Sequence, residues 1–147
     1  MKNERISDIK KLSLQSKNHY CCIDMNKYCD YDCFDGNKFL NEAGKELKDG
    51  ADILHAFPLI SEHFSDSITV EWMKKLRELC AIYNCLLIIN NRLDIARVIE
   101  ADGIFLDEKG ILIKDMIDIS DGLIIGTSQK NFEFADFIKN KDTIQIL

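Results

Sequence analysis

Several side chains that could do chemistry follow directly after short apolar stretches of the sequence. They are Asp24 and the residues at 55–58, 90–92, 107–110 and 126–130. Histidine, carboxylate, amide and guanidinium groups at such positions can bind a phosphate, move a proton or hold a cation. None of these positions carries a P-loop, a dinucleotide-binding glycine motif or a nucleophile-elbow motif. The common nucleotide-binding and serine-hydrolase functions are therefore not indicated.

Arg92 has the side chain best suited to bind a phosphate, because a guanidinium can donate to two of its oxygens at once. An ion pair of Arg92 with Asp94 or Asp24 would instead make it a structural residue, and both interpretations stay open. The amide of Asn90 is expected to orient the loop backbone rather than to contact a ligand.

Further polar groups follow the later apolar stretches. Ser128 with Gly126 could form a small anion-binding nest or a plain turn. Lys130 could supply a cation to the same site or lie in solvent. Asp107 with Glu108 could hold a cation loosely, although a solvated acidic pair in a loop explains them more simply.

The sequence also carries a histidine and several aromatic residues close to these stretches. A lone histidine such as His55, with no carboxylate or cysteine beside it, is usually structural. Tyr20, Phe57 and Phe105 could stack on an aromatic ligand ring, and packing in the core explains them equally well. The ligand expected from these residue types is a small phosphorylated or aromatic heterocyclic molecule.

Six cysteines occur in a chain whose first residues are charged and show no secretion signal, so free thiols in a reducing cytoplasm are expected. Four of them lie in one short region: Cys21, Cys22, Cys29 and Cys33. A zinc site would need two ligand pairs from this set, but the adjacent Cys21 and Cys22 would point to opposite faces of a strand. Buried hydrophobes and loop thiols are the expected roles, and Cys80 and Cys85 are expected in the core.

The composition is that of one soluble globular domain, with 147 residues of which 46% are hydrophobic and 30% charged. A net charge of −6 argues against a nucleic-acid-binding surface. The longest apolar run, residues 85–89, is far too short to cross a bilayer, so no membrane partner is expected. We expect residues 1–17 to form a polar or helical extension and residues 18–147 to form a single domain.

Apolar stretches alternate with amphipathic helical spacing along the chain. The expected strands are 20–23, 51–56, 86–89, 103–106, 123–125 and 143–147. The expected helices are 39–47, 69–83 with Thr69 as its cap, 93–100 and 131–139. This alternation predicts an α/β fold built on a parallel sheet with helices on both faces. Ligands bind such sheets beyond the carboxyl ends of the strands, where the candidate side chains lie.

Two segments carry a family resemblance. Residues 86–108 read LLIINNRLDIARVIEADGIFLDE, and residues 124–131 read IIGTSQKN. The first resembles the LIINDRVDLALAVGADGVHLGQED region of the thiamine-phosphate synthase family, and the second resembles its IIGVSTHS motif. Upstream, residues 20–24 resemble the family's opening YLVTD strand, and residues 39–54 resemble its EAALEGGVTLVQ segment.

The resemblance implies a (βα)8 barrel and a role in thiamine biosynthesis. The family's synthase joins a pyrimidine pyrophosphate to a thiazole phosphate with magnesium, and a related thiazole tautomerase would need no magnesium. The positions that match the family's motifs are Asp24, Asn90, Arg92, Ser128 and, with an acid in place of an amide, Glu108. The candidate ligand-binding residues are Asp24, His55, Asn90, Asn91, Arg92, Glu108, Ser128 and Lys130.

The sequence departs from the family where the chemistry should lie. The two aspartates that hold the family's magnesium correspond to Asn91 and Gly110, which are poor ligands for a hard dication. The strand end that supplies the family's arginine and lysine for the pyrophosphate reads HAFPL here, at residues 55–59, and a family histidine is Phe105. We therefore expect no magnesium site and an impaired or lost transferase activity, with residual binding of a phosphorylated ligand.

The family continues for two more strands, which build its thiazole-phosphate site, so we expect an incomplete TIM-barrel-like fold of about six strands. An incomplete barrel leaves two sheet edges open. We expect these edges to be covered by a second copy in a homodimer or by apolar residues of the segment 1–17. An alternative function is a non-catalytic binding or scaffold domain that acts through an open sheet edge.

Overall fold

The computed structural model describes residues 19–107, 122–127 and 144–146 of the chain. The candidate residues Glu108, Ser128 and Lys130 lie outside these ranges, as does Gly110. The extension expected at 1–17 and the helix expected at 131–139 also lie outside them.

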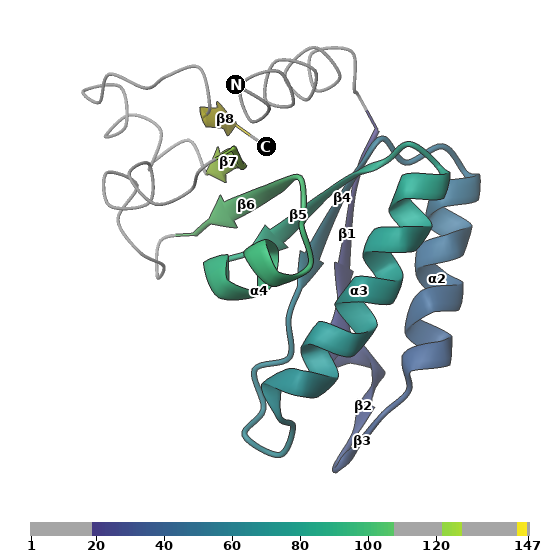
Figure 1. Ribbon diagram of the computed structural model, residues 1–147. Coiled ribbons are helices and arrows are strands. Elements are labelled where there is room, and N and C mark those ends of the chain that lie inside the picture. Colours follow the sequence, from purple (N-terminus) through teal and green to yellow (C-terminus); the bar gives the residue numbers. More distant parts are fainter. Residues whose placement is uncertain (1–18, 108–121, 128–143, 147) are drawn as a thin grey trace.

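Six parallel strands form one sheet, and they follow one another across it in sequence order (Figure 1). The strands are β1 (Tyr20–Asp24), β4 (Ile53–Phe57), β5 (Leu86–Asn90), β6 (Gly103–Leu106), β7 (Ile124–Thr127) and β8 (Ile144–Ile146). The prediction of a parallel α/β sheet in this order is confirmed. Because all strands run the same way, their carboxyl ends gather at one end of the sheet.

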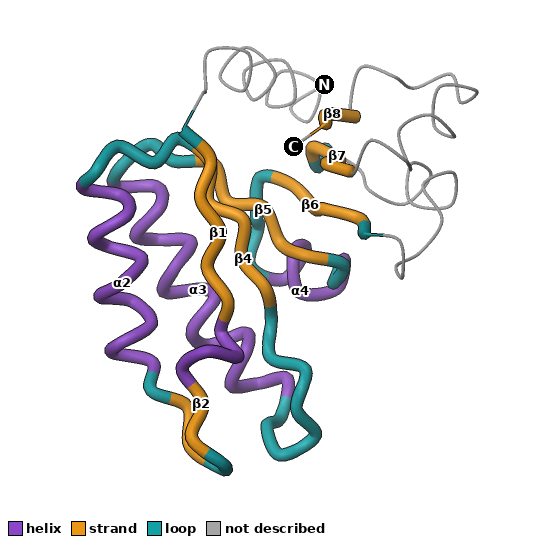
Figure 2. Tube along the Cα trace, turned by 180° about the vertical axis from the view of Figure 1, so that it is seen from behind, coloured by secondary structure: helices purple, strands orange, loops and turns teal. Residues whose placement is uncertain are grey.

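The helices α2 (Gly36–Lys48), α3 (Asp66–Ile82) and α4 (Leu93–Val98) cover one and the same face of this sheet (Figure 1, Figure 2). Helices on both faces were therefore a wrong expectation for the described part of the chain. The strands form a barrel-like wall, whose inner face packs strand side chains against one another instead of against helices. Among the described helices, none is both long and apolar enough to cross a membrane.

The start of α3 also differs from the expectation. Ser65 occupies the N-cap position, and Thr69 lies inside the helix, where it is buried. The helix opens with the exposed Asp66 and Ser67, so its amphipathic pattern becomes visible in the sequence only from Ile68 and Thr69 onward. The cap expected at Thr69 is therefore wrong by one helical turn.

The segment between the expected strand 20–23 and the expected helix 39–47 also contains regular structure. It forms the short helix η1 (Met25–Tyr28) and a small antiparallel hairpin of β2 (Cys29–Asp30) and β3 (Cys33–Phe34). Asp24 caps η1 by accepting from the backbone N–H of Asn26 at 2.9 Å. This hairpin projects beyond the carboxyl end of β1 (Figure 1).

Two clusters of buried side chains can be described, one on each face of the sheet. The larger group packs the helices against the strands, with Phe39 and Met73 among its fully buried helical members. The smaller group lies on the inner face and consists of Ile53, Leu86, Ile88 and Ile124, with Phe105 packed against it. This inner group is the apolar floor of the barrel-like wall.

An Ala-Asp pair precedes both β4 and β6, and the two aspartates make the same pair of contacts. The backbone N–H of Asp52 donates to the carbonyl of His19 at 2.8 Å, and its carboxylate accepts from the His19 N–H at 3.1 Å. The backbone N–H of Asp102 donates to the carbonyl of Leu87 at 2.9 Å, and its carboxylate accepts from the Leu87 N–H at 2.8 Å. Each aspartate thus links its own strand to the preceding strand of the sheet.

Replacing Gly103 by alanine is expected to lower the free energy of unfolding by about 1–3 kcal/mol. A Cβ atom at this position would lie 2.6 Å from the carbonyl oxygen of Ile124 and 3.0 Å from its Cβ. Because that carbonyl belongs to the neighbouring strand, the strain cannot be relieved by a side-chain rotation. Urea unfolding followed by circular dichroism measures the effect.

Gly44 in α2 offers the matched control, because a Cβ atom there would meet nothing within 4 Å. Gly44→Ala is expected to leave the stability unchanged or to raise it by about 0.5–1 kcal/mol, since alanine is the better helix former. Equal unfolding midpoints for Gly103→Ala and the unmodified chain would show that the β6–β7 contact is looser than described.

Candidate functional site

A cavity of about 720 Å³ opens at the carboxyl ends of β1, β4, β5 and β6. Its walls come from the loops that follow these strands and from the first turn of α3. The lining residues include three of the candidates in direct succession, Asn90, Asn91 and Arg92, together with Asp24, Phe57, Asp66 and Asp107. A cavity of this size at this end of a parallel sheet can hold a small organic ligand.

Arg92 lines this cavity but is already paired with two carboxylates. Its Nε and Nη2 donate to the two oxygens of Asp94 at 2.9 and 2.7 Å. Its Nη1 also donates to Asp66 at 3.3 Å. The hydrogen bonds to Asp94 raise the pKa of the Arg92 guanidinium above its ordinary value, and the same bonds lower the pKa of the Asp94 carboxyl. A phosphate would therefore have to compete with two carboxylates for this cation.

Asp24, the other partner considered for Arg92, is engaged elsewhere. Its carboxylate accepts from the backbone N–H of Asn26 at 2.9 Å and from the Asn26 side-chain amide at 2.8 Å. That amide also donates to the carbonyl of Pro58 at 2.9 Å and so joins the loops after β1 and β4. Asp24 therefore supports the cavity wall, and of the two partners considered for Arg92 the structure shows Asp94.

Asn91 holds two strand ends together. Its backbone has a positive φ of 59°, and its side-chain oxygen accepts from the N–H of Asp107 at 3.0 Å. Its own N–H donates to the carbonyl of Phe105 at 2.7 Å. The side-chain oxygen that could have faced a metal therefore joins the carboxyl ends of β5 and β6.

The described residues do not fit a magnesium ion at these strand ends. Asn91 is neutral and already bonded, and Asp66 faces Arg92. Among the residues described, the one group of three ligating side chains that converge within 4.8 Å is His19, Cys21 and Glu46, which do not line the cavity. Magnesium prefers several oxygen ligands that converge on one point, and the cavity wall described here does not supply them.

His55 lies on the inner face of the barrel-like wall, below the cavity, and is 2% exposed. Its Nε2 bonds to the side-chain oxygen of Asn90 at 3.0 Å, and its Nδ1 bonds to the hydroxyl of Tyr20. Since the amide oxygen can only accept, Nε2 carries the proton and Nδ1 accepts from Tyr20. The thiol of Cys22 donates to the same hydroxyl at 3.5 Å. His55 thus joins β1, β4 and β5 by side-chain hydrogen bonds.

Aromatic rings enclose His55. Phe57 stacks on it with ring centroids 4.4 Å apart, and the Phe105 ring lies 4.6 Å away. Burial lowers the pKa of His55 from its ordinary value of 6.5 to about 4, although Asn90 and Asp107 act in the opposite direction. His55 is therefore a neutral structural histidine at pH 7, in line with the structural interpretation.

The charges around the cavity are predominantly negative. Among the described residues that line it, the carboxylates are Asp24, Glu62, Asp66 and Asp107, and the one cation is Arg92. Phe57 and Leu59 line the wall after β4 and bring no charge. A strongly anionic ligand would therefore meet an unfavourable field.

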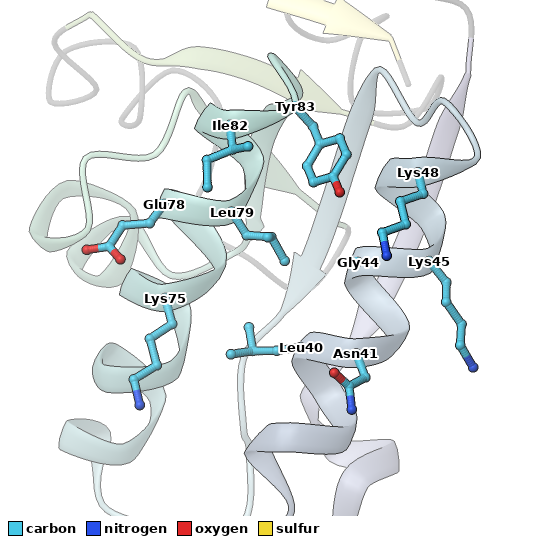
Figure 3. Close-up of a pocket in the computed structure, with 10 residues that line it drawn as sticks. All are labelled: Leu40, Asn41, Gly44, Lys45, Lys48, Lys75, Glu78, Leu79, Ile82 and Tyr83. Carbon is cyan, nitrogen blue, oxygen red and sulfur yellow. The ribbon is translucent and has the colours of Figure 1, made fainter.

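A second cavity, of about 650 Å³, lies on the outer surface between α2 and α3 (Figure 3). Leu40 and Leu79 point into the gap between the two helices, and Lys45, Lys48 and Lys75 line it further out. It lies away from the carboxyl ends of the strands, and none of its lining residues is a candidate from the sequence.

The structure brings together Asp24, Asn90, Asn91 and Arg92 at the cavity wall, with His55 beneath them. Sequence reasoning missed Asp66, which is 26 residues from Arg92 along the chain. The sequence indicates only that Asp66 lies in the first turn of a helix that follows a strand. That position does not show that Asp66 pairs with Arg92. Asn26 was missed in the same way.

The protein belongs to the class of barrel-like α/β proteins. Its cavity for a small ligand lies at the carboxyl ends of parallel strands, as is usual for this class. Residues 29–143 match the family described as thiamine monophosphate synthase. The chain therefore belongs to this family, as its sequence motifs indicated.

Individual relatives agree with this assignment. A protein of Aquifex aeolicus, assigned provisionally as thiamine-phosphate synthase 2, is 30% identical over 122 residues, which are 83% of this chain and 60% of the relative. The thiamine-phosphate synthase of Dictyoglomus thermophilum is 42% identical over 74 residues, 48% of this chain and 33% of the relative. This chain thus spans less than two thirds of the length of these relatives.

Solved structures support the same fold. Thiamine phosphate pyrophosphorylase from Pyrococcus furiosus superimposes with a TM-score of 0.67 and 21% identity, over 90% of this chain and 61% of that protein. An enolase from a Sargasso Sea environmental sequence gives a TM-score of 0.51 at 17% identity, over 82% of this chain and 34% of that protein. The TIM-barrel-like α/β architecture expected from the sequence is confirmed.

Proposed function

We propose that this chain binds a small phosphorylated or aromatic heterocyclic molecule in the strand-end cavity, and that its thiamine-phosphate synthase activity is impaired or lost. The observation that carries the proposal is the charge of the cavity wall. Within the described part of the chain, four carboxylates and one already paired guanidinium line it. This arrangement disfavours a ligand as highly charged as a pyrophosphate, and it still allows one phosphate to reach Arg92.

The reaction of the family releases pyrophosphate, so its transition state needs cations placed in advance around the leaving group. Phe57 and Leu59 stand where the family's motif has cations, and Asn91 bonds to the backbone N–H of Asp107 at 3.0 Å. Loss of a single electrostatic contact of this kind costs on the order of 10²–10³ in rate. Two such losses support the proposal of a severely reduced rate.

The parts of the cavity that favour a ligand are Arg92 and the ring of Phe57. Arg92 can bind a phosphate if it exchanges Asp66, its weaker partner, for a phosphate oxygen. Phe57 is half-buried in the cavity wall and offers an aromatic face near the same strand ends. Asn90 adds an amide group whose oxygen already accepts from His55.

We expect a coupled assay with pyrimidine pyrophosphate, thiazole phosphate and magnesium to show about 10⁻³ turnovers per second or fewer. This rate is some 10⁴-fold below a typical enzyme rate of about 10 per second. Turnover near one per second that falls sharply in Arg92→Ala would contradict the proposal. Arg97→Ala serves as the control, because Arg97 is an exposed residue of α4 that does not line the cavity.

Ligand binding is tested separately by calorimetric titration with thiazole phosphate. Asp66→Asn is expected to strengthen binding about two- to fivefold, because an exposed ion pair that holds Arg92 away from the ligand is removed. Glu62→Gln removes the same charge from the same cavity without touching a partner of Arg92, and it should have the smaller effect. Equal effects of the two variants would mean that Arg92 does not contact the phosphate.

We also propose a cytoplasmic location for the chain. The support is its cysteines, which form no disulfide in the described part of the chain and so suit a reducing compartment; they are Cys21, Cys22, Cys29, Cys33, Cys80 and Cys85. The association through open sheet edges expected above stays a prediction, and sedimentation of the purified chain tests it.

A further inference from the structure

Three metal-ligating side chains meet at the amino end of β1. Cys21 Sγ lies 3.3 Å from Nε2 of His19 and 3.2 Å from Oε2 of Glu46. All three ligating atoms lie within 4.8 Å of one another, and all three residues are half-buried. The strand-end cavity lies at the opposite, carboxyl end of the same strand and shares none of these residues.

Rigid elements hold these three side chains in place. His19 directly precedes β1, and its backbone is bonded through both its N–H and its carbonyl to Asp52. Cys21 is two residues further along, so it projects to the same face of the strand, which is the face covered by α2. Glu46 comes from α2, whose residue Leu47 is buried in the core. Cys21 and Glu46 therefore come from regular elements, and hydrogen bonds to Asp52 hold the backbone of His19.

We propose that His19, Cys21 and Glu46 form a binding site for a divalent transition metal of the zinc type. Zinc binds thiolate, imidazole and carboxylate ligands at about 2.3, 2.0 and 2.1 Å in tetrahedral geometry, which places neighbouring ligand atoms roughly 3.5 Å apart. The two distances at Cys21, 3.3 and 3.2 Å, are close to this spacing. Only small side-chain movements would be needed to admit the ion.

The donor set indicates the class of metal. A thiolate and an imidazole favour zinc, cobalt or copper over magnesium or calcium, which prefer oxygen ligands. Three protein ligands leave a fourth position of the tetrahedron for water or another small molecule. Binding would displace the thiol proton of Cys21, which is released to solvent.

This site differs from a zinc site built from the four cysteines between residues 21 and 33. Cys29 and Cys33 belong to the hairpin beyond the carboxyl end of β1, so they lie far from Cys21 along the strand. Cys22 points to the inner face, where its thiol donates to Tyr20. The partners of Cys21 are instead a histidine and a helical glutamate.

Titration of the reduced, chelator-treated full chain with Co²⁺ tests the proposal, because cobalt replaces zinc and reports its ligands by absorption. We expect one equivalent of Co²⁺ to bind with a thiolate-to-cobalt charge-transfer band and tetrahedral d–d bands, and zinc to displace it. Cys21→Ser should abolish the charge-transfer band. Cys22→Ser, the adjacent residue on the opposite face, should keep the band.

The other two ligands have matched controls in the same chain. His19→Gln and Glu46→Gln are each expected to weaken Co²⁺ binding by about 100-fold or more, since even groups behind a metal ligand are worth about 10–100-fold. His63→Gln, at an exposed histidine, and Glu42→Gln, one turn earlier on α2, should bind as the unmodified chain does. Circular dichroism of each variant establishes that it is folded.

Two results would overturn the site. One is the absence of any stoichiometric Co²⁺ binding at micromolar concentration by the folded chain. The other is a charge-transfer band that survives in Cys21→Ser and disappears in Cys29→Ser or Cys33→Ser. Neither result bears on the strand-end cavity, whose ligands are tested independently with thiazole phosphate.

Discussion

Replacing Asp102 by alanine is expected to lower the free energy of unfolding by about 3–5 kcal/mol, the usual cost of breaking a buried ion pair from one side. The Asp102 side chain is buried and lies 3.5 Å from Nη2 of Arg77. Its carboxylate also accepts from the N–H of Leu87 at 2.8 Å. The free energy of unfolding of a domain is only about 5–15 kcal/mol, so the variant should be marginally stable.

The loss of stability in Asp102→Ala has two parts, because the Asp102 carboxylate serves two partners. Alanine would leave the N–H of Leu87 buried without its acceptor, and a buried donor without a partner is costly. It would also leave the guanidinium of Arg77 half-buried without the carboxylate of Asp102. The first loss falls between β5 and the start of β6, and the second falls between α3 and the start of β6.

Urea unfolding compares Asp102→Ala with Glu78→Ala, whose acidic side chain is exposed on α3 next to Arg77. The control should lie within about 0.5 kcal/mol of the unmodified chain, as surface substitutions usually do. Asp102→Asn should fall between the two, since its amide oxygen can still accept from Leu87. A loss below about 1 kcal/mol for Asp102→Ala would show that solvent replaces the carboxylate at little cost.

Acidification from pH 7 to pH 5 is expected to remove about 2 kcal/mol of stability through His55 alone. Burial lowers the pKa of His55 from 6.5 to about 4 in the folded chain. The unfolded chain therefore binds the proton more tightly than the folded chain between these two values. The contribution of His55 to stability is complete above pH 6.5, and it is lost progressively as the pH falls toward 4.

His55→Gln separates this effect from other titrating groups, because glutamine keeps a hydrogen-bond donor and does not titrate. The variant is expected to be less stable at pH 7, since it loses the stacking on Phe57, but its stability should change less between pH 7 and pH 5. His63→Gln, at an exposed histidine, should keep the pH dependence of the unmodified chain. An identical pH dependence in His55→Gln would show that His55 titrates normally.

The order and direction of the strands could be predicted from the sequence. The β6 bounds, Gly103–Leu106, coincide with the expected stretch, and the other strands differ by only one or two residues at either end. The expected stretches 86–89, 103–106 and 123–125 are apolar throughout, and all six stretches are short, so their signal is local. The hairpin at residues 29–34 was missed because its strands have two residues each and no alternating pattern.

Which face the helices cover could not be predicted, because an apolar strand looks the same under a helix and inside a barrel. Only the curvature of the wall, set by strand pairing across the sheet, distinguishes Leu54 and Leu87 on the helical side from Ile53 and Ile88 on the inner side. The position of the cavity did follow from the sequence, since the carboxyl ends of parallel strands must gather at one end.

By itself the sequence determined the family, the strand order and the residues that gather at the strand ends, because each depends on patterns of neighbouring residues. Only the tertiary structure decided what those residues do. Arg92 pairs with Asp66 across 26 residues, His55 bonds to Asn90 across 35, and Cys21 meets Glu46 across 25. The pairing of Arg92, the tautomer of His55 and the proposed metal site each depend on atoms that lie a few ångströms apart. Chain folding brings these atoms together from sequence positions that no local pattern connects.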